Sequence, residues 1–228
     1  EDEAERLTFP PNVLPLKVPC LALVSPWLML HAFDMGAQGF ALISGGKCGS
    51  GIAPTRWRES VQFVQGLFNC WDIEPERIKV FEVEEDSFIS FELEIGKFTR
   101  GIAELDPTPL SKPTSLSVEC WLLPSLIRDI RHKLGNSSRG IVSTGTVPFG
   151  KVELDDSQCT GCGLCALDCA TGALTASSSD ETNSYQLLFK HDYCVACGRC
   201  IEVCPEKCLK LERILELDRI GSPPTVLF

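Results

Sequence analysis

The chain has 228 residues, of which 44% are hydrophobic and 23% are charged, and its formal net charge is −10. That length is enough for two packed domains. An acidic balance argues against nucleic acid or an anionic membrane surface as a partner, because both select basic patches. No apolar run approaches the roughly 20 residues of a membrane span, and no signal-peptide pattern opens the chain. We therefore expect a cytoplasmic protein with no membrane span and no nucleic-acid partner.

The first hundred residues alternate short apolar runs with stretches of helical character. The apolar runs predict buried strands at 12–19, 39–45 and 78–84. The helical stretches lie at 25–36, 55–71 and 87–103. Ser25 suits the N-cap of the first of these helices, and the second helix carries an apolar stripe at steps of three and four residues. This β-α-β-α-β-α order predicts an α/β domain with a parallel sheet covered by helices.

Few residues in this half suggest a catalytic or ligand-binding role. The glycine-rich loop 44–51 follows a predicted strand, but it matches neither a phosphate-binding loop nor a dinucleotide fingerprint. We expect His31 to be a partly exposed structural residue. Cys20 and Cys48 each follow a predicted strand, and sites in a parallel sheet form at that edge.

A stretch rich in Pro, Ser and Thr at 105–115 predicts a linker. After it, residues 115–135 predict an amphipathic helix, in which Pro124 marks either a kink or the true start. We expect Cys120 on this helix, and Cys70 on the earlier one, to be core residues.

Nine of the thirteen cysteines lie between Cys159 and Cys208. Residues 159–169 and 194–204 both read C-x2-C-x2-C-x3-C, which is the ligand spacing of bacterial-type iron–sulfur proteins. Three cysteines in one short turn can bind one cube, while the fourth begins a helix that leads away towards a neighbouring cube. Two copies of one unit are typical of a ferredoxin, and about residues 150–215 resemble the bacterial two-cluster ferredoxin family.

The resemblance implies two [4Fe–4S] clusters with crossed ligands, so that each cluster takes three thiolates from one motif and one from the other. The A set of ligands is Cys159, Cys162, Cys165 and Cys204, and the B set is Cys194, Cys197, Cys200 and Cys169. Small residues inside the motifs leave backbone N–H groups close to the sulfurs, where they can stabilise thiolate charge. We expect this of Thr160, Gly161, Gly163, Ala196 and Gly198.

Two positions depart from the ferredoxin pattern. Ala170 stands where the family usually has Pro, which removes a rigid turn but no ligand. Cys208 stands where a small apolar residue is usual, and we expect a packed free thiol there, not a ninth ligand. Between the motifs, residues 175–193 predict a hairpin with a polar tip at 177–184.

Zinc is the alternative ligand for so many cysteines. Structural zinc prefers two separated C-x2-C pairs that close one tetrahedral site. Three evenly spaced cysteines in each motif, with Pro205 after the second motif, fit iron–sulfur ligation better.

The first half carries a second resemblance, in the runs 9–20, 28–48 and 72–83. Over about residues 4–104 the chain resembles the delta (iron–sulfur) subunit of methyl-viologen-reducing hydrogenase. That domain also occurs with the flavin subunit of heterodisulfide reductases. The resemblance implies a small Rossmann-like α/β fold and a [2Fe–2S] cluster that relays electrons between an oxidoreductase and a flavin subunit.

The ligands for this [2Fe–2S] cluster are incomplete. Cys20 matches a family cysteine, but Cys48 stands alone where the family has a G-C-x4-C pair, and the family's first strand would lie before Glu1. Two cysteines cannot complete a four-thiolate site, so we favour loss of the cluster over its completion by that strand. We also expect the strand to lie between strands at 13–19 and 39–44, supplied by a longer natural chain or by another chain.

The sequence thus predicts four regions: a hydrogenase-delta-like α/β domain at 1–105, a linker with an amphipathic helix at 106–149, a two-cluster ferredoxin domain at 150–215 and a C-terminal tail at 216–228. We expect a non-catalytic electron-transfer component of an anaerobic oxidoreductase complex, with a flavin-containing subunit of the heterodisulfide reductase A type as partner. The alternatives are a zinc-bound assembly module without redox activity, and a ferredoxin-type reductase that binds its own flavin or nucleotide.

Overall fold

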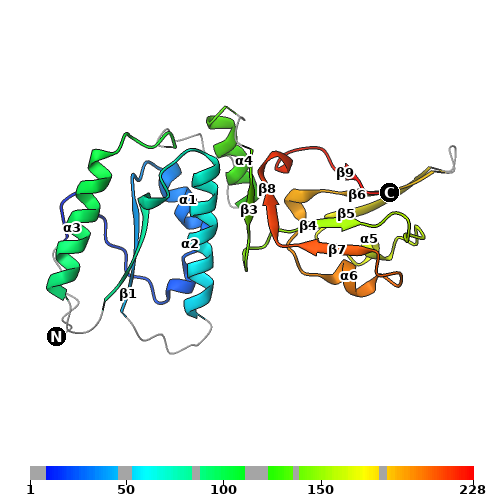
Figure 1. The fold of residues 1–228 in the computed structure, drawn as a ribbon, viewed down its shortest axis with the longest axis horizontal. Coiled ribbons are helices and arrows are strands. Elements are labelled where there is room, and N and C mark those ends of the chain that lie inside the picture. Colours follow the sequence, from blue (N-terminus) through cyan, green and yellow to red (C-terminus); the bar gives the residue numbers. More distant parts are fainter. Residues whose placement is uncertain (1–8, 46–52, 84–87, 111–122, 136–138, 180–183) are drawn as a thin grey trace. The chain divides into compact units, whose positions relative to one another are not determined.

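A computed structural model of the chain describes residues 9–45, 53–83, 88–110, 123–135, 139–179 and 184–228 (Figure 1). The chain divides into two compact units, Glu1–Leu126 and Ile127–Phe228. Within the described ranges, no helix combines the length and the apolar character that a membrane crossing needs.

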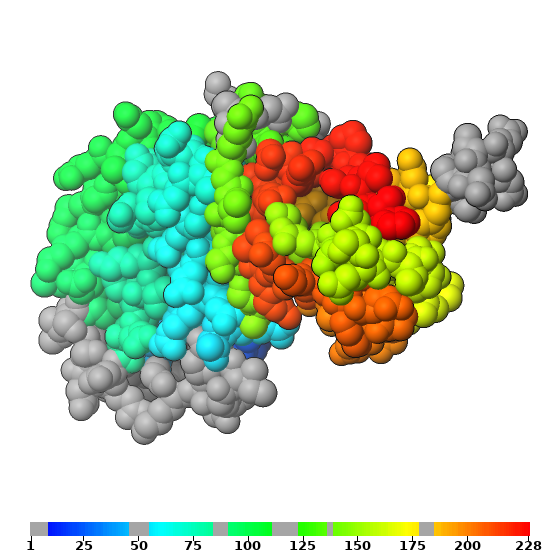
Figure 2. Space-filling model, turned by 45° about the vertical axis from the view of Figure 1, so that its right-hand side comes forward, coloured from blue at the N-terminus to red at the C-terminus, as the bar shows by residue number. Residues whose placement is uncertain are grey.

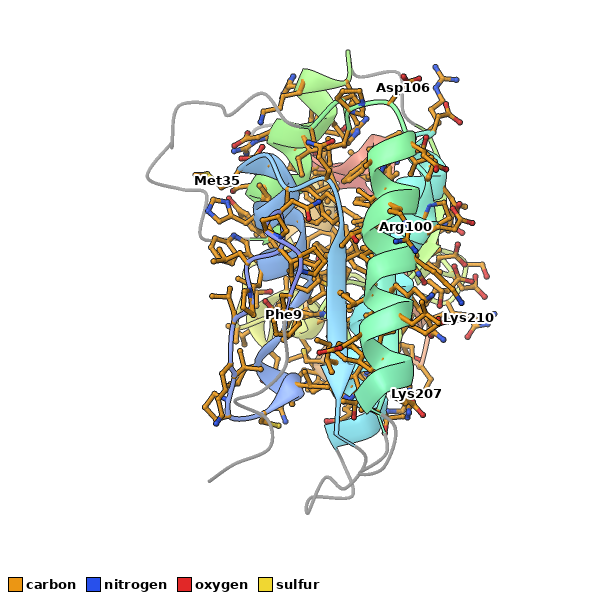
Figure 3. The ribbon with its side chains drawn as sticks, turned by 90° about the vertical axis from the view of Figure 1, so that its left-hand side faces the viewer. Phe9, Met35, Arg100, Asp106, Lys207 and Lys210 are labelled. Atoms are coloured by element: carbon orange, nitrogen blue, oxygen red, sulfur yellow. The ribbon has the colours of Figure 1, made fainter. Side chains whose placement is uncertain are left out.

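The first unit is built around two parallel strands, β1 (Phe40–Ser44) and β2 (Ile78–Glu82). Three helices accompany them: α1 (Pro26–Asp34), α2 (Ala53–Cys70) and α3 (Phe88–Glu104). Helix α3 covers one face of the strand pair, and α1 and α2 lie on the other face (Figures 1 and 3). The three predicted helices and two of the three predicted strands are confirmed, and the unit mixes helices with a parallel strand pair.

Local sequence signals explain the helix ends and their buried faces. The side chain of Ser25 accepts a hydrogen bond from the backbone N–H of Leu28 at 3.3 Å and so caps α1. On the face covered by α3, Phe91 of α3 packs edge-on against Phe81 of β2, and Phe9 packs edge-on against Phe91. The predicted apolar stripe of α2 is buried at every position, namely Trp57, Val61, Val64, Leu67, Phe68 and Trp71.

Residues 12–19 form no strand, so that prediction is wrong. Pro11, Pro15 and Pro19 remove a backbone donor every fourth residue, which weakens any hydrogen-bond ladder. The side chains of Leu14 and Leu16 are 81% and 76% exposed, so the apolar residues of this run do not form a buried face. Residues 13–19 therefore do not form one of the two strands expected to flank a further strand, and the further strand expected before Glu1 stays a prediction.

A buried guanidinium joins three segments of the first unit. Arg77, just before β2, is only 1% exposed. It forms an ion pair with Glu74 at 2.8 Å and donates hydrogen bonds to the backbone oxygens of Gln38 and Asp106 at 3.1 and 2.5 Å. Because each donor finds an oxygen, the charge is compensated and the starts of both strands are held to the segment after α3.

The second unit consists of small antiparallel sheets. They pair β3 (Ile141–Ser143) with β8 (Ile214–Glu216), β4 (Lys151–Leu154) with β7 (Leu209–Glu212), and β6 (Ser184–Phe189) with both β5 (Leu174–Ser179) and β9 (Thr225–Val226). The helices are α4 (Leu123–Lys133), α5 (Leu164–Leu167) and α6 (Arg199–Val203). The predicted hairpin is confirmed as β5 and β6, and residues 180–183 of its tip lie outside the described ranges.

The described part of α4 contains Pro124 as its second residue. Residues 115–122 of the predicted helix, Cys120 among them, lie outside the described ranges. Whether Pro124 marks a kink or the start of the helix therefore stays a prediction.

The C-terminal residues pack on the second unit. Strand β9 pairs with β6, so the hairpin becomes a three-stranded sheet. Before it, the backbone N–H of Glu216 donates to His191 Nε2 at 3.2 Å, and the N–H of Gly221 donates to the carboxylate of Asp192 at 3.1 Å. These hydrogen bonds hold Glu216 and Gly221 against the turn at 191–193, which leads into the second cysteine motif.

Candidate iron–sulfur site

Sulfurs from both cysteine motifs line one cavity of the second unit. The cavity is partly open to solvent. Its apolar wall includes Leu154, Leu187 and Leu209. The cysteines that line it are Cys159, Cys162, Cys165, Cys204 and Cys208, which are the whole A set and one further thiol. The fold therefore brings the last cysteine of the second motif to the first three cysteines of the first motif.

The A-set sulfurs differ in exposure and in acidity. Cys162 is exposed, whereas Cys204 is 6% exposed. Burial raises the pKa of the Cys165 thiol, and the charges of Cys162 and Cys159 add to the increase. Burial also opposes ionisation of Cys204, but hydrogen bonds from the Cys208 backbone and thiol and from neighbouring N–H groups outweigh it, so the pKa of Cys204 is lowered. The pocket thus favours a thiolate at Cys204.

The B-set cysteines lie in the same unit and influence one another electrostatically. Cys194 and Cys200 are buried, Cys169 is half-buried and Cys197 is exposed. Burial raises the pKa of the Cys200 thiol to about 11, and the charges of Cys194, Cys197 and Cys169 contribute to the increase. Burial likewise raises the pKa of Cys194, with Cys169 again among the charges that contribute. Cys169 therefore lies within electrostatic reach of the second motif, as crossed ligation requires.

The backbone of the cysteine loops turns N–H groups towards sulfur. Gly161, Gly163, Gly198 and Ala196 all have positive φ angles, between 53° and 80°, and α5 and α6 begin directly after Gly163 and Gly198. Of the residues predicted to donate, Ala196 forms a backbone hydrogen bond to the Cys194 thiol.

Two further donors were not predicted from sequence. The N–H of Leu174 lies 3.3 Å from Cys169 Sγ, and the backbone of Gly150 bonds to Cys194. No spacing rule marks Gly150, because it reaches Cys194 only through the pairing of β4 with β7. A Cβ atom at Gly150 would lie 2.8 Å from Leu211 Cδ1 and 3.0 Å from Ala196 Cβ, so a larger residue there would require its neighbours to move.

Two aromatic residues that the sequence analysis also missed contact the first cysteine loop. The rings of Tyr185 and Phe228 meet edge-on with centroids 5.8 Å apart. A Cβ atom at Gly161 would lie 3.5 Å from the Tyr185 ring and 3.6 Å from the Phe228 ring. The space-filling view shows the end of the chain on the surface of the second unit (Figure 2). The apolar run that ends the chain, TVLF, is the signal that could have indicated a short strand there.

A salt bridge connects the two motifs. Arg199 of α6 donates to both carboxylate oxygens of Asp168, which follows α5, at 2.9 and 3.2 Å. The bidentate geometry sets the relative position of the two short helices, of which α5 contains Cys165 of the A set and α6 contains Cys200 of the B set.

The arrangement of the A set fits a cluster. Its sulfurs surround a cavity, which a cube of iron and sulfide ligated at its corners requires. Among the residues with described positions, no three Cys, His, Asp or Glu side chains lie close enough to hold a single metal ion.

The first unit contains fewer candidate ligands for an iron–sulfur cluster. Cys20 Sγ accepts a hydrogen bond from the N–H of Ala22 at 3.4 Å and caps a short 3-10 turn, Leu21–Leu23. Cys48 and most of the glycine-rich loop lie outside the described residues. His31 is half-buried and stacks on Trp27 at 4.7 Å, which confirms a structural role, whereas Cys70 is half-buried and not in the core as predicted.

Comparison with known families agrees with both halves of this picture. Residues 2–106 match the family described as methyl-viologen-reducing hydrogenase, delta subunit. Residues 152–211 match the 4Fe–4S dicluster domain. Both resemblances predicted from the sequence are thereby confirmed.

Curated relatives match about 30% of the chain. Pyruvate synthase subunit PorD of Methanothermobacter marburgensis is 34% identical over 70 residues, which are 31% of this chain and 75% of the relative. Polyferredoxin protein MvhB of the same organism is 35% identical over 78 residues, 30% of this chain and 19% of the relative. The uncharacterized ferredoxin MJ0265 of Methanocaldococcus jannaschii is 35% identical over 72 residues, 30% of this chain and 37% of the relative. The chain thus spans only part of each relative.

A dicluster domain with cysteines gathered around a cavity defines an iron–sulfur electron-transfer protein. More particularly, the chain belongs to the ferredoxin-type 4Fe–4S dicluster proteins, and it joins that domain to one of the hydrogenase delta-subunit family.

Proposed function

We propose that the chain relays electrons through two [4Fe–4S] clusters between a flavin-containing subunit of the heterodisulfide reductase A type and another redox subunit. The A set would hold one cluster and the B set the other. When bound, each cluster takes up and releases a single electron. The observation that carries the proposal is the cavity lined by cysteines from both motifs.

The residues around the sulfurs support an anionic cluster. The lowered pKa of Cys204 favours the thiolate that iron requires. The N–H groups of Leu174 and Ala196 place positive dipole ends at Cys169 and Cys194. Leucine side chains on the cavity wall restrict water, and burial and N–H···S bonds are what set cluster potentials.

The exposed cysteines indicate where electrons would enter and leave. Cys162 and Cys197, one from each set, are exposed. Apolar side chains stand exposed close to them in the sequence: Leu164 at 43%, Leu167 at 85% and Val195 at 42%. Exposed apolar residues beside a redox centre suit a partner that docks closely enough for electron transfer.

The family matches of both units support the choice of partner. Its family is a hydrogenase subunit, and PorD is a subunit of pyruvate synthase, so both matches favour a multisubunit redox complex. A heterodisulfide reductase A-type flavoprotein fits the resemblance of the first unit. The chain would carry no substrate chemistry of its own.

The first test is the cofactor content of the chain purified without oxygen. We expect about eight irons and about eight sulfides per chain and a visible absorption band that dithionite bleaches. Zinc without visible absorption would establish the assembly-module alternative, and a flavin or nucleotide in the extract would establish the reductase alternative. As a matched control, Cys70→Ser should keep the full iron content, because Cys70 lies in the first unit, outside both sets.

The second test addresses the partner. The dithionite-reduced chain, freed of excess reductant, is mixed with an oxidised heterodisulfide reductase A-type subunit. We expect bleaching of the flavin absorption as the clusters reoxidise. An unchanged flavin spectrum would refute this choice of partner while leaving the cluster assignment intact.

A further inference from the structure

Cys208 lies inside the A-set cavity without belonging to the A set. Its Sγ atom is 3.5 Å from Cys204 Sγ, and its side chain is 6% exposed. The same residue also lines the cavity with Cys159, Cys162 and Cys165. That distance suits a hydrogen bond between two sulfurs and is too long for a disulfide bond.

The 3.5 Å separation by itself allows either sulfur to donate the hydrogen bond. A cysteine that binds iron does so as a thiolate and has no proton to give. With Cys204 as a cluster ligand, the thiol of Cys208 is therefore the donor and Cys204 the acceptor.

The B set lacks this fifth sulfur. Cys169, Ala173 and Leu174 stand at the same spacing in the first half as Cys204, Cys208 and Leu209 in the second. Ala173 is 3% exposed, so it is as buried as Cys208. At the position equivalent to Cys208, the first half therefore carries a buried methyl group in place of a thiol.

We propose that Cys208 is a positioning residue whose S–H donates a hydrogen bond to the Cys204 ligand and raises the reduction potential of the A-set cluster above that of the B-set cluster. This inference rests on the proposed function. A donor to a ligand sulfur stabilises the reduced cluster, which carries one more negative charge. The electron would then reside preferentially on the A-set cluster, so transfer would run from the B set to the A set.

The test is a redox titration of the loaded protein, followed by electron paramagnetic resonance. Each signal is assigned by its loss in Cys159→Ser or in Cys194→Ser. In Cys208→Ala we expect the reduction equilibrium of the A-set cluster to shift about tenfold, which is about 59 mV downwards for one electron, because one hydrogen bond to a charged group is lost. The B-set potential and the iron content should stay unchanged.

Three further variants sharpen the result. Cys208→Ser retains a donor of similar size, so its A-set potential should lie between those of the parent and Cys208→Ala. Ala173→Cys should raise the B-set potential. Cys70→Ser should move neither signal.

An unchanged A-set potential in Cys208→Ala, or equal shifts at both clusters, would overturn the inference. Loss of iron from Cys208→Ala would also overturn it, since Cys208 would then be a ligand. Absence of iron and sulfide from the parent protein would instead overturn the proposed function, and the inference with it.

Discussion

Crossed ligation is the prediction that most directly tests the second unit. Cys169 belongs to the first motif by sequence, but its charge acts on Cys194 and Cys200 of the second motif. Cys169→Ser should therefore damage the cluster of the B set and spare that of the A set. The serine oxygen can still accept from the N–H of Leu174, now bonded to Cys169 Sγ at 3.3 Å, so we expect the fold to persist.

The expected loss of iron follows from the assignment of four cysteines to each of two clusters. If the weakened cluster is lost whole, Cys169→Ser should hold about four irons where the parent holds about eight. Two substitutions in one set should cost no more than one, while substitutions in different sets should add. Cys169→Ser combined with Cys200→Ser should therefore hold about four irons, and Cys169→Ser combined with Cys159→Ser almost none.

Iron and sulfide analysis of the four proteins decides the matter, with circular dichroism to check that each variant is folded. The matched variant is Cys204→Ser, which should lose the A-set cluster. Its loss of iron should not increase when it is combined with Cys159→Ser, but should add to the loss caused by Cys200→Ser. If Cys169→Ser combined with Cys159→Ser retained about four irons, both residues would ligate the same cluster, and crossed ligation would be wrong.

Other predictions concern the support around the sulfurs. Gly150→Ala should lower the stability of the second unit by roughly 1–3 kcal/mol in denaturant unfolding, because its Cβ would lie 2.8 Å from Leu211 Cδ1; an unchanged midpoint would contradict the contact. Burial lowers the pKa of His191 from 6.5, so the unfolded chain takes up a proton that the folded chain resists. Stability is therefore complete above about pH 6.5 and falls as the pH drops below it, and His191→Gln should flatten that dependence relative to the parent. Phe228→Ala removes the ring that meets Tyr185, so the visible absorption should decay faster in air than in the parent; equal decay rates would show that the ring protects nothing.

Much of this protein could be predicted from local sequence. The spacing of the cysteines depends only on residues close together in the chain, and it indicated a dicluster domain that the family comparison confirms. Ser25 caps α1 as expected, and the apolar stripe of α2 is buried as expected, because capping and helical periodicity are also short-range properties. The ligand assignments themselves stay predictions.

Tertiary structure alone decided the features that depend on distant segments. Residues 12–19 have the apolar character of a strand, but a strand exists only where another backbone pairs with it, and prolines remove donors there. Likewise, Tyr185 and Phe228 meet only because β9 pairs with β6. Cys208 looked like an isolated thiol in the sequence, four residues after Cys204. The turn between Cys204 and β7 brings the two sulfurs to 3.5 Å, and no spacing rule specifies that approach, because it depends on how the whole second unit closes around the cavity.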